Sequence, residues 1–198
     1  MRIAPRLDHQ FASGSDHPSV ELRAGIYAHW EKARAKGVPL PCAVVLGCPP
    51  AISYAAVQKM PENLDEVAVA GGLVGSAINV VRAKTVPLMV PAEAEIVIEG
   101  FIDTRWLEPE APFGESHGYV NLQEYNAFMD VTAITRRRNP ILTSFISQVT
   151  PSESSVIKKV AYEPLFLAHL KRELGVKGIR RVVMHERLTN LRPVIFLQ

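Results

Sequence analysis

The stretch Pro41-Cys42-Ala43-Val44-Val45-Leu46-Gly47 decides the fold class of this chain. It is a short, uncharged, apolar run that ends at a glycine, a pattern typical of a strand buried on both faces. A second strand is predicted over residues 95–102, where apolar residues alternate around Glu99. Together with the helices described next, these strands predict an α+β protein with β-structure in the middle of the chain.

Amphipathic helices flank this β-rich region. One is predicted over residues 19–36, capped by Ser19 and ended by Gly37, with one apolar stripe formed by Leu22, Ile26, Trp30 and Ala33. Another is predicted over residues 152–174, where Pro164 should kink or divide the helix. The other predicted elements are a short helix after Pro49-Pro50, a helix over 66–78, strands over 79–83, 127–136, 141–147, 179–185 and 194–197, and a loop over 103–118.

The order of these elements predicts two domains. Residues 1–148 form the first, and residues 149–198 form the beginning of an incomplete C-terminal α/β domain. The last predicted strand, Val194-Ile195-Phe196-Leu197, is apolar and almost reaches the final residue, as in a chain cut inside a domain. An uncovered strand edge recruits other chains, so we expect the chain to be poorly soluble or obligately oligomeric when it is made alone.

Composition narrows the class of protein. The chain has 198 residues, is 47% hydrophobic and carries a net charge of +2, which excludes global disorder and gives no support for nucleic-acid or membrane binding. It has no apolar span for a bilayer and no signal-peptide pattern, so a soluble, cytoplasmic protein is expected. Cys42 and Cys48 are interpreted as reduced, buried residues, and Arg136-Arg137-Arg138 as the solvated end of a strand rather than a phosphate clamp.

The stretch Glu108-Pro109-Glu110-Ala111-Pro112-Phe113-Gly114-Glu115-Ser116-His117-Gly118-Tyr119 is the richest in chemistry. Pro112 and Gly114 exclude a regular helix, so a turn is expected to position Glu110 and Glu115. Two adjacent carboxylates cannot ionise equally, so one becomes an acid that can donate a proton near neutral pH. His117 would add a further titrating group. The alternative is an exposed acidic loop whose glutamates face water.

This stretch, read as Glu110-x-Pro-Phe-Gly-Glu115-x-His-Gly-Tyr119, resembles the glutamate motif of the UbiD family of reversible decarboxylases, which includes the phenylacrylic acid decarboxylases. The resemblance extends over most of residues 20–150 in order and spacing. Its further blocks are Pro41-x-Ala43-x-x-x-Gly47-x-Pro49-Pro50, Met60-Pro61, Glu66 followed by Ala70-Gly71, Val90-Pro91-Ala92-x-x-Glu95-Ile96-Val97-x-Glu99-Gly100 and Arg138-Asn139-Pro140-Ile141.

The resemblance implies a fold, a cofactor and a reaction. The fold is a flavin-binding split β-barrel followed by the start of a C-terminal α/β domain. The cofactor is prenylated FMN, whose phosphate is held through a divalent metal, usually Mn²⁺, and K⁺. Substrates are aromatic or α,β-unsaturated carboxylic acids, and the flavin accepts the electrons released as CO2 departs. The resemblance names neither the acid nor the direction of the reaction.

Site residues follow from the resemblance position by position. Glu115 matches the proton donor to the carbon that loses CO2, and Glu110 matches its partner, which pairs with an arginine. Glu66 matches the carboxylate that binds the metal at the flavin phosphate. Met60 and the residues before it match a loop whose carbonyls hold the monovalent cation. The alternative for Glu66 is a glutamate favoured only by the helix dipole.

The chain also departs from the family pattern. The catalytic arginine and a metal-binding asparagine lie upstream of the matching segment, and family members are more than twice as long. The metal-binding histidine should lie near Leu22. Replacements that no motif supports are His9 or His17 for the histidine, which are otherwise loop residues, and Arg2, Arg6 or Arg23 for the arginine.

Three functions therefore stand side by side. The first is a decarboxylase chain that is truncated, or one piece of a split enzyme whose partner chain supplies the arginine and asparagine; a homo-oligomer or a partner subunit is expected. The second is a non-catalytic remnant that binds flavin or a partner chain. The third, a flavin reductase, is weaker because the paired glutamates have no role in it.

Overall fold

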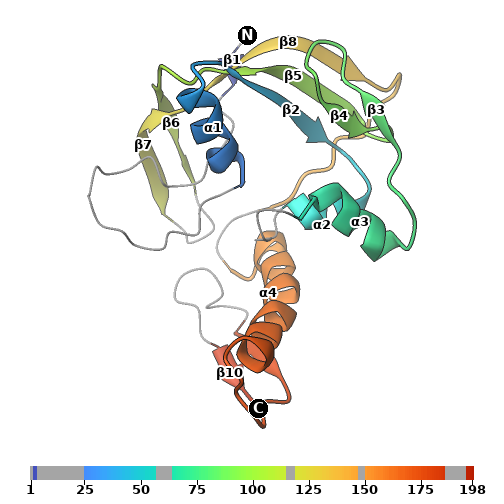
Figure 1. The fold of residues 1–198 in the computed structure, drawn as a ribbon, viewed down its shortest axis with the longest axis vertical. Helices are drawn as coiled ribbons and strands as arrows, with labels where there is room; N and C mark the ends of the chain where they lie inside the picture. The colour runs from blue at the N-terminus through green and yellow to red at the C-terminus, as the bar shows by residue number, and fades with distance from the viewer. Residues whose placement is uncertain (1, 4–24, 57–63, 115–118, 147–149, 186–194) are drawn as a thin grey trace. The chain divides into compact units, whose positions relative to one another are not determined.

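The computed structural model describes residues 2–3, 25–56, 64–114, 119–146, 150–185 and 195–198 (Figure 1). The chain divides into two compact units. Unit 1 contains the described residues of 1–111 and 123–143, and unit 2 those of 112–122 and 144–198. The elements are β1 (Arg2–Ile3), α1 (Gly25–Ala35), β2 (Leu40–Leu46), α2 (Pro50–Ala56), α3 (Glu66–Val74), β3 (Val80–Arg82), β4 (Met89–Pro91), β5 (Ile96–Ile102), β6 (Glu108–Gly114), β7 (Val120–Asn126), β8 (Met129–Arg136), α4 (Glu153–Arg172), β9 (Val182–Met184) and β10 (Ile195–Leu197).

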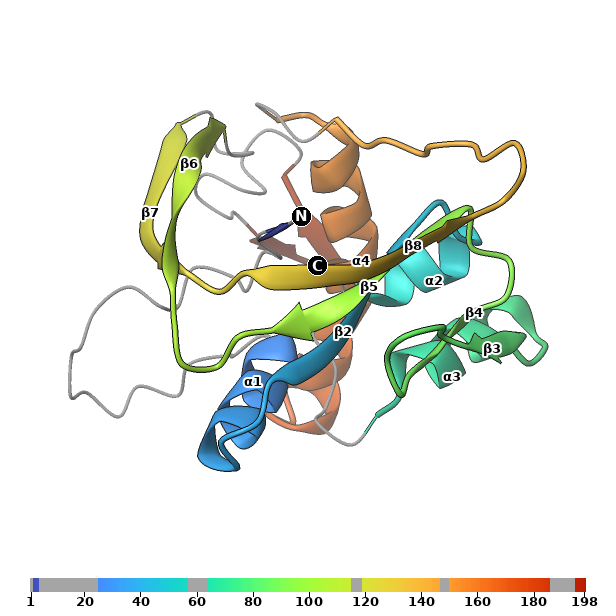
Figure 2. The same cartoon turned by 90° about the horizontal axis from the view of Figure 1, so that it is seen from above.

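A four-stranded antiparallel sheet in the order β1-β8-β5-β2 is the centre of unit 1, with β2, β5 and β8 side by side (Figure 2). A β-bulge interrupts the pairing of β5 with β8 between Glu99 and Gly100. At Gly100 the neighbouring backbone comes very close, because an added Cβ would lie 2.9 Å from Cγ of Met129 and closer still to the carbonyl oxygen of Asp130. Glycine is required there.

Alternating residues of β2 and β5 enter two separate cores on the two faces of this sheet. We call the first the helix-side core, because α1 covers it; it contains Trp30, Cys42, Ile102, Ala127 and Met129. The second, the hairpin-side core, lies under the β3–β4 sheet and contains Ala83, Val86, Val90 and Val97. Each face of the sheet therefore carries a buried cluster, although neither face is fully covered.

Helix α1 confirms the predicted apolar stripe over its described part. Trp30 and Ala33 are buried, and Ile26 packs against the helix-side core. The indole Nε1 of Trp30 donates a hydrogen bond to the carbonyl oxygen of Asp103, 2.9 Å away. Gly37, with φ of 67°, follows the helix as predicted. Residues 19–24, including the predicted cap Ser19, lie outside the described residues.

Several expectations for the strands were wrong. In β2 only Cys42 is buried and its neighbours are half-buried, because short elements cover the sheet incompletely. The predicted loop over 103–118 contains β6, and β7 and β4 were missed; Pro109 and Pro112 within β6 hid its β-character from the sequence pattern. The predicted strand over 141–147 is irregular over 141–146, where every residue is exposed.

Helix α4 is the main element of unit 2. Ser152 caps it, in a reciprocal pair of hydrogen bonds with Ser155. Pro164 lies inside this helix and does not divide it, so of the two expected effects the division was wrong and the kink stays a prediction. Pro164 has no amide hydrogen to donate to the carbonyl of Val160, four residues earlier. Because Val160 is exposed, water can donate to this carbonyl instead.

The β9–β10 sheet completes unit 2 and pairs antiparallel, from Val182 opposite Leu197 to Met184 opposite Ile195. The amide of Met184 donates to Oε1 of Glu163 on α4, 2.8 Å away. All three residues of β10 are exposed. No helix within the described parts of the chain is both long and apolar enough to cross a bilayer.

The predicted domain boundary between residues 148 and 149 stays a prediction. The boundary between the two compact units instead falls between Thr143 and Ser144, and the described residues of 112–122 belong to unit 2. Residues 147–149 lie outside the described residues.

Candidate functional site

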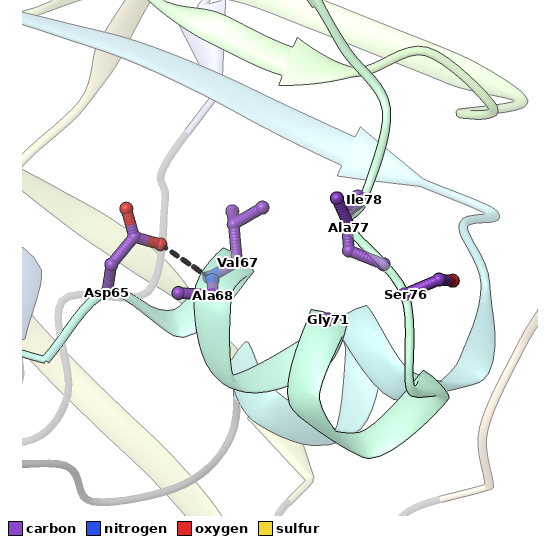
Figure 3. A pocket seen from close by; sticks show the side chains of 7 residues that line it. All are labelled: Asp65, Val67, Ala68, Gly71, Ser76, Ala77 and Ile78. Carbon is purple, nitrogen blue, oxygen red and sulfur yellow. Dashed lines mark hydrogen bonds between the residues drawn. The ribbon is translucent and has the colours of Figure 1, made fainter.

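The start of helix α3 carries the best-described candidate site residue, Glu66. The residue before it, Asp65, is the N-cap and has an extended backbone. Its Oδ1 accepts hydrogen bonds from the amides of Val67 at 2.7 Å and Ala68 at 3.1 Å, as drawn in part in Figure 3. The amide of Val69 donates to the carbonyl oxygen of Asp65. These bonds fix the first turn of α3 and make Glu66 its first residue.

An open pocket of about 360 Å³ lies beside this helix end (Figure 3). Its walls are small or aliphatic except for Asp65 and Ser76. Lining residues come from α3 and from the segment that follows it: Asp65, Val67, Ala68, Gly71, Ser76, Ala77 and Ile78. The helix ends at Gly75 in the left-handed conformation, which turns the chain back along the pocket.

Glu66 is exposed, and no other described residue forms a hydrogen bond or ion pair with its side chain. A free carboxylate is a hard oxygen ligand and suits a divalent cation such as Mn²⁺. The described residues contain no group of three or more His, Cys, Asp or Glu side chains placed to hold a metal. Glu66 therefore fits a shared site, in which a phosphate, water or residues outside the described ranges complete the coordination.

The other predicted site residues are placed only in part. Glu110 lies within strand β6 and not in the expected turn, because residues 108–114 are extended. The structure describes the backbone of Glu110 but not its side chain. The other candidate residues lie wholly outside the described ranges: Met60, Glu115, His117, His9, His17, Arg6 and Arg23. Whether Glu66, Glu110 and Glu115 meet in one site stays a prediction.

Glu99 is the one buried carboxylate among the described residues, but its bonds indicate a structural role. Its side chain is 1% exposed and accepts hydrogen bonds from the amides of Lys84 and Thr85 and from the Thr85 hydroxyl, at 2.6–2.9 Å. Burial raises the pKa of Glu99, but these bonds and one from the Val86 amide outweigh burial, so the pKa is lowered overall. The carboxylate stays ionised and ties the turn after β3 to the sheet.

The arginines after β8 follow the same structural pattern. Arg137 lies 3.4 Å from Oε1 of Glu95 and donates to the carbonyl oxygen of Glu93. Oε2 of Glu95 accepts the amide of Ile141 at 3.1 Å. All three arginines are exposed, in agreement with a solvated strand end. A pocket of about 270 Å³ here contains Cys48, whose Sγ lies 3.3 Å from the Ser53 hydroxyl.

Both cysteines are free thiols. Cys42 is buried, and burial raises the pKa of its thiol. Cys48 is only half-buried, because it follows the strand in the turn before α2, so the expectation that both are buried was right for Cys42 alone.

Comparison with known proteins identifies the family. A family model described as UbiD, 3-octaprenyl-4-hydroxybenzoate carboxy-lyase Rift-related domain, matches residues 14–149, about two thirds of the chain. The chain belongs to the UbiD family. The matched range includes Met60, Glu66, Glu110 and Glu115, so all four candidate residues lie within the UbiD region.

Solved structures of UbiD-class enzymes share the fold. HmfF from Pelotomaculum thermopropionicum, in complex with FMN, is 30% identical with a TM-score of 0.76; the match covers 86% of this chain and 37% of HmfF. Vanillic acid decarboxylase from Sedimentibacter hydroxybenzoicus is 25% identical with a TM-score of 0.73; the match covers 87% of this chain and 36% of the decarboxylase. The 3,4-dihydroxybenzoic acid decarboxylase of Klebsiella pneumoniae is 27% identical with a TM-score of 0.67; the match covers 80% of this chain and 34% of that enzyme.

This UbiD chain thus has a mixed α and β fold with antiparallel sheets that matches UbiD-class enzymes, and it spans little more than a third of their length. Sequence reasoning missed one residue at the site, Asp65. An aspartate directly before the run Glu66-Val67-Ala68-Val69-Ala70 is an N-cap pattern, and it predicts the helix start that the structure has.

Proposed function

We propose that this chain is the UbiD-type part of a carboxy-lyase that uses prenylated FMN to remove CO2 reversibly from an aromatic or α,β-unsaturated carboxylic acid. The match of the UbiD family model over 14–149, which contains every candidate acidic residue, carries this proposal. It is supported by solved relatives that are named as decarboxylases or as complexes with FMN or prenylated FMN.

The proposed fold is more specific than the observed class. The β-rich part is proposed to be a flavin-binding split barrel over residues 1–148, followed by the start of an α/β domain at 149–198. The antiparallel sheet β1-β8-β5-β2, with helices and hairpins on its faces, is compatible with part of such a barrel.

The cofactor is proposed to be held through metal ions. When bound, prenylated FMN accepts the electron pair released as CO2 leaves the substrate. Glu66 is proposed to bind Mn²⁺ opposite the flavin phosphate, and carbonyls around Met60 to bind K⁺. The exposed, unshared carboxylate of Glu66 supports the first assignment.

The two motif glutamates are proposed to divide the proton chemistry. Glu115 delivers a proton to the carbon that has lost CO2, and Glu110 keeps Glu115 protonated at working pH. Glu115 directly follows Gly114, the last residue of β6, so a strand end fixes the chain on one side of it. A partner subunit is proposed to supply the arginine and the metal-binding asparagine of the family pattern, and a homo-oligomer is proposed as the alternative assembly.

The test compares Glu115→Gln with Glu110→Gln in protein reconstituted with prenylated FMN, Mn²⁺ and K⁺, alone and with any co-encoded subunit. Decarboxylation of aromatic and cinnamic-type acids is followed by product formation. We expect Glu115→Gln to lose turnover by at least the 10²–10⁴-fold typical of general acids, and Glu110→Gln to lose less and shift the pH profile. Turnover by Glu115→Gln at the wild-type rate would refute the assignment. Stoichiometric flavin binding without turnover would favour the non-catalytic, flavin-binding alternative.

A further inference from the structure

The inference concerns Asp65 and rests on the proposed binding of Mn²⁺ by Glu66. An α-helix leaves its first amide groups without partners inside the helix, and a nearby carboxylate is attracted to them. In α3, Oδ1 of Asp65 satisfies the amides of both Val67 and Ala68. Glu66 is therefore not needed as a cap, and its carboxylate stays exposed.

Without the Asp65 carboxylate, the same two amides would lack their acceptor. Glu66, the first residue of the helix, carries the nearest remaining carboxylate in the chain sequence and is drawn toward those amides by charge. A carboxylate that hydrogen-bonds the helix end must break those bonds before it can bind a cation. The N-cap and the cation would then compete for one side chain.

We infer that Asp65 is a positioning residue for the metal site: by capping α3 it leaves the Glu66 carboxylate free to bind a divalent cation. The inference concerns hydrogen bonding rather than the charge of Asp65. It therefore predicts that a neutral side chain able to cap the helix can replace Asp65.

The chain offers a matched control for this cap. Oδ1 of Asp103 accepts the amides of Arg105 at 2.7 Å and Trp106 at 3.2 Å, so it binds the amides two and three residues ahead, as Asp65 does. Asp103 begins the turn after β5 and not a helix that carries a candidate ligand. Asp103→Ala therefore removes an equivalent pair of bonds without changing α3.

The experiment measures the Kd of Mn²⁺ for the full chain with saturating FMN, from the electron paramagnetic resonance signal of free Mn²⁺. Wild type, Glu66→Gln, Asp65→Ala, Asp65→Ser, Asp65→Asn and Asp103→Ala are compared, and circular dichroism checks that each is folded. We expect Glu66→Gln to lose binding and Asp65→Ala to weaken it about five- to tenfold, the range that follows from the usual free energy of an N-cap. Asp65→Ser, Asp65→Asn and Asp103→Ala should stay within about twofold of wild type.

The outcomes separate the inference from the proposed function. If Glu66→Gln binds Mn²⁺ like wild type, the proposed role of Glu66 fails and the inference fails with it. If Glu66→Gln loses binding but Asp65→Ala does not, only the inference is overturned. Equal loss in Asp65→Ala, Asp65→Ser and Asp65→Asn would also overturn it, because the charge of Asp65, and not its cap, would then matter.

Discussion

In unit 1 a four-stranded sheet has a buried core on each face, whereas in unit 2 one long helix packs against a two-stranded sheet. Unit 1 buries large side chains such as Trp30, Ile102 and Met129. The fully buried residues described in unit 2 are Ser155, Ala161, Val182 and Met184, and its last strand is exposed. Among the described residues, unit 1 therefore buries more and larger apolar side chains than unit 2, so most of the core that burial stabilises lies in unit 1.

The largest expected effect lies in the helix-side core of unit 1. Trp30→Ala removes a side chain that is 2% exposed and the hydrogen bond from its indole to Asp103. We expect the free energy of unfolding to fall by about 3–5 kcal/mol, measured by urea denaturation. Trp106, which is 63% exposed, is the control; an equal loss in Trp106→Ala would contradict the assigned core.

The next largest effect on stability is expected at Gly100, where the paired strands β5 and β8 come very close. Gly100→Ala would force a methyl group against the carbonyl oxygen of Asp130, so we expect a loss of about 1–3 kcal/mol in the free energy of unfolding. At Gly72 in α3 an added Cβ meets nothing within 4 Å. Gly72→Ala should therefore raise stability by up to about 1 kcal/mol. Urea denaturation of both variants tests the contrast, and Gly100→Ala as stable as wild type would contradict the close approach.

The buried carboxylate of Glu99 should make the stability of unit 1 depend on pH. The pKa of Glu99 is lowered in the folded protein, so its contribution is present above the ordinary value of 4.5 and is lost as the pH falls through the folded pKa. Glu99→Gln should cost about 1 kcal/mol at neutral pH, because an amide group replaces one acceptor oxygen with a donor. Its Tm should fall less than that of wild type between pH 5 and pH 3. If the Tm of wild type and of Glu99→Gln fell equally over this pH range, Glu99 would not be the cause of the loss of stability in acid.

The smallest effect on folding, and the sharpest contrast with unit 1, is expected at β10. Phe196 is 55% exposed, so Phe196→Lys should change the free energy of unfolding by no more than about 0.5 kcal/mol. Self-association should nevertheless fall, because a charge on an exposed strand prevents edge pairing. Size-exclusion chromatography measures it, with Leu174→Lys, another exposed site in unit 2, as control. A wild-type chain that elutes as a stable monomer would contradict the prediction of oligomerisation.

The spacing of apolar residues in the sequence predicted the elements that bury one of their faces. The stripe of Ile26, Trp30 and Ala33 predicted the described part of α1, and the apolar run at 41–47 predicted β2. It failed at β6, whose prolines have no amide to donate, and at 141–146, whose apolar residues are exposed. Hydrophobicity alone does not distinguish a strand from an exposed, irregular segment.

The candidate site shows a similar division. The family resemblance selected Glu66, and local capping chemistry would have added Asp65 from the sequence. The turn expected around Glu110 was wrong, because β6 pairs with β7, the next strand along the chain, and this pairing extends the segment. The partner strand lies outside the motif, so the motif alone did not predict the pairing.

The hydrogen bond between Trp30 and Asp103 has a mechanical consequence. The carbonyl oxygen of Asp103 accepts the hydrogen bond from the Trp30 indole, and Oδ1 of the same residue accepts the amides of Arg105 and Trp106 in the turn that leads toward β6. Helix α1 and the origin of the strand that carries Glu110 are therefore linked by one residue. Because packed interiors resist small displacements, a substitution that moved α1 would also disturb the start of the segment that leads to β6.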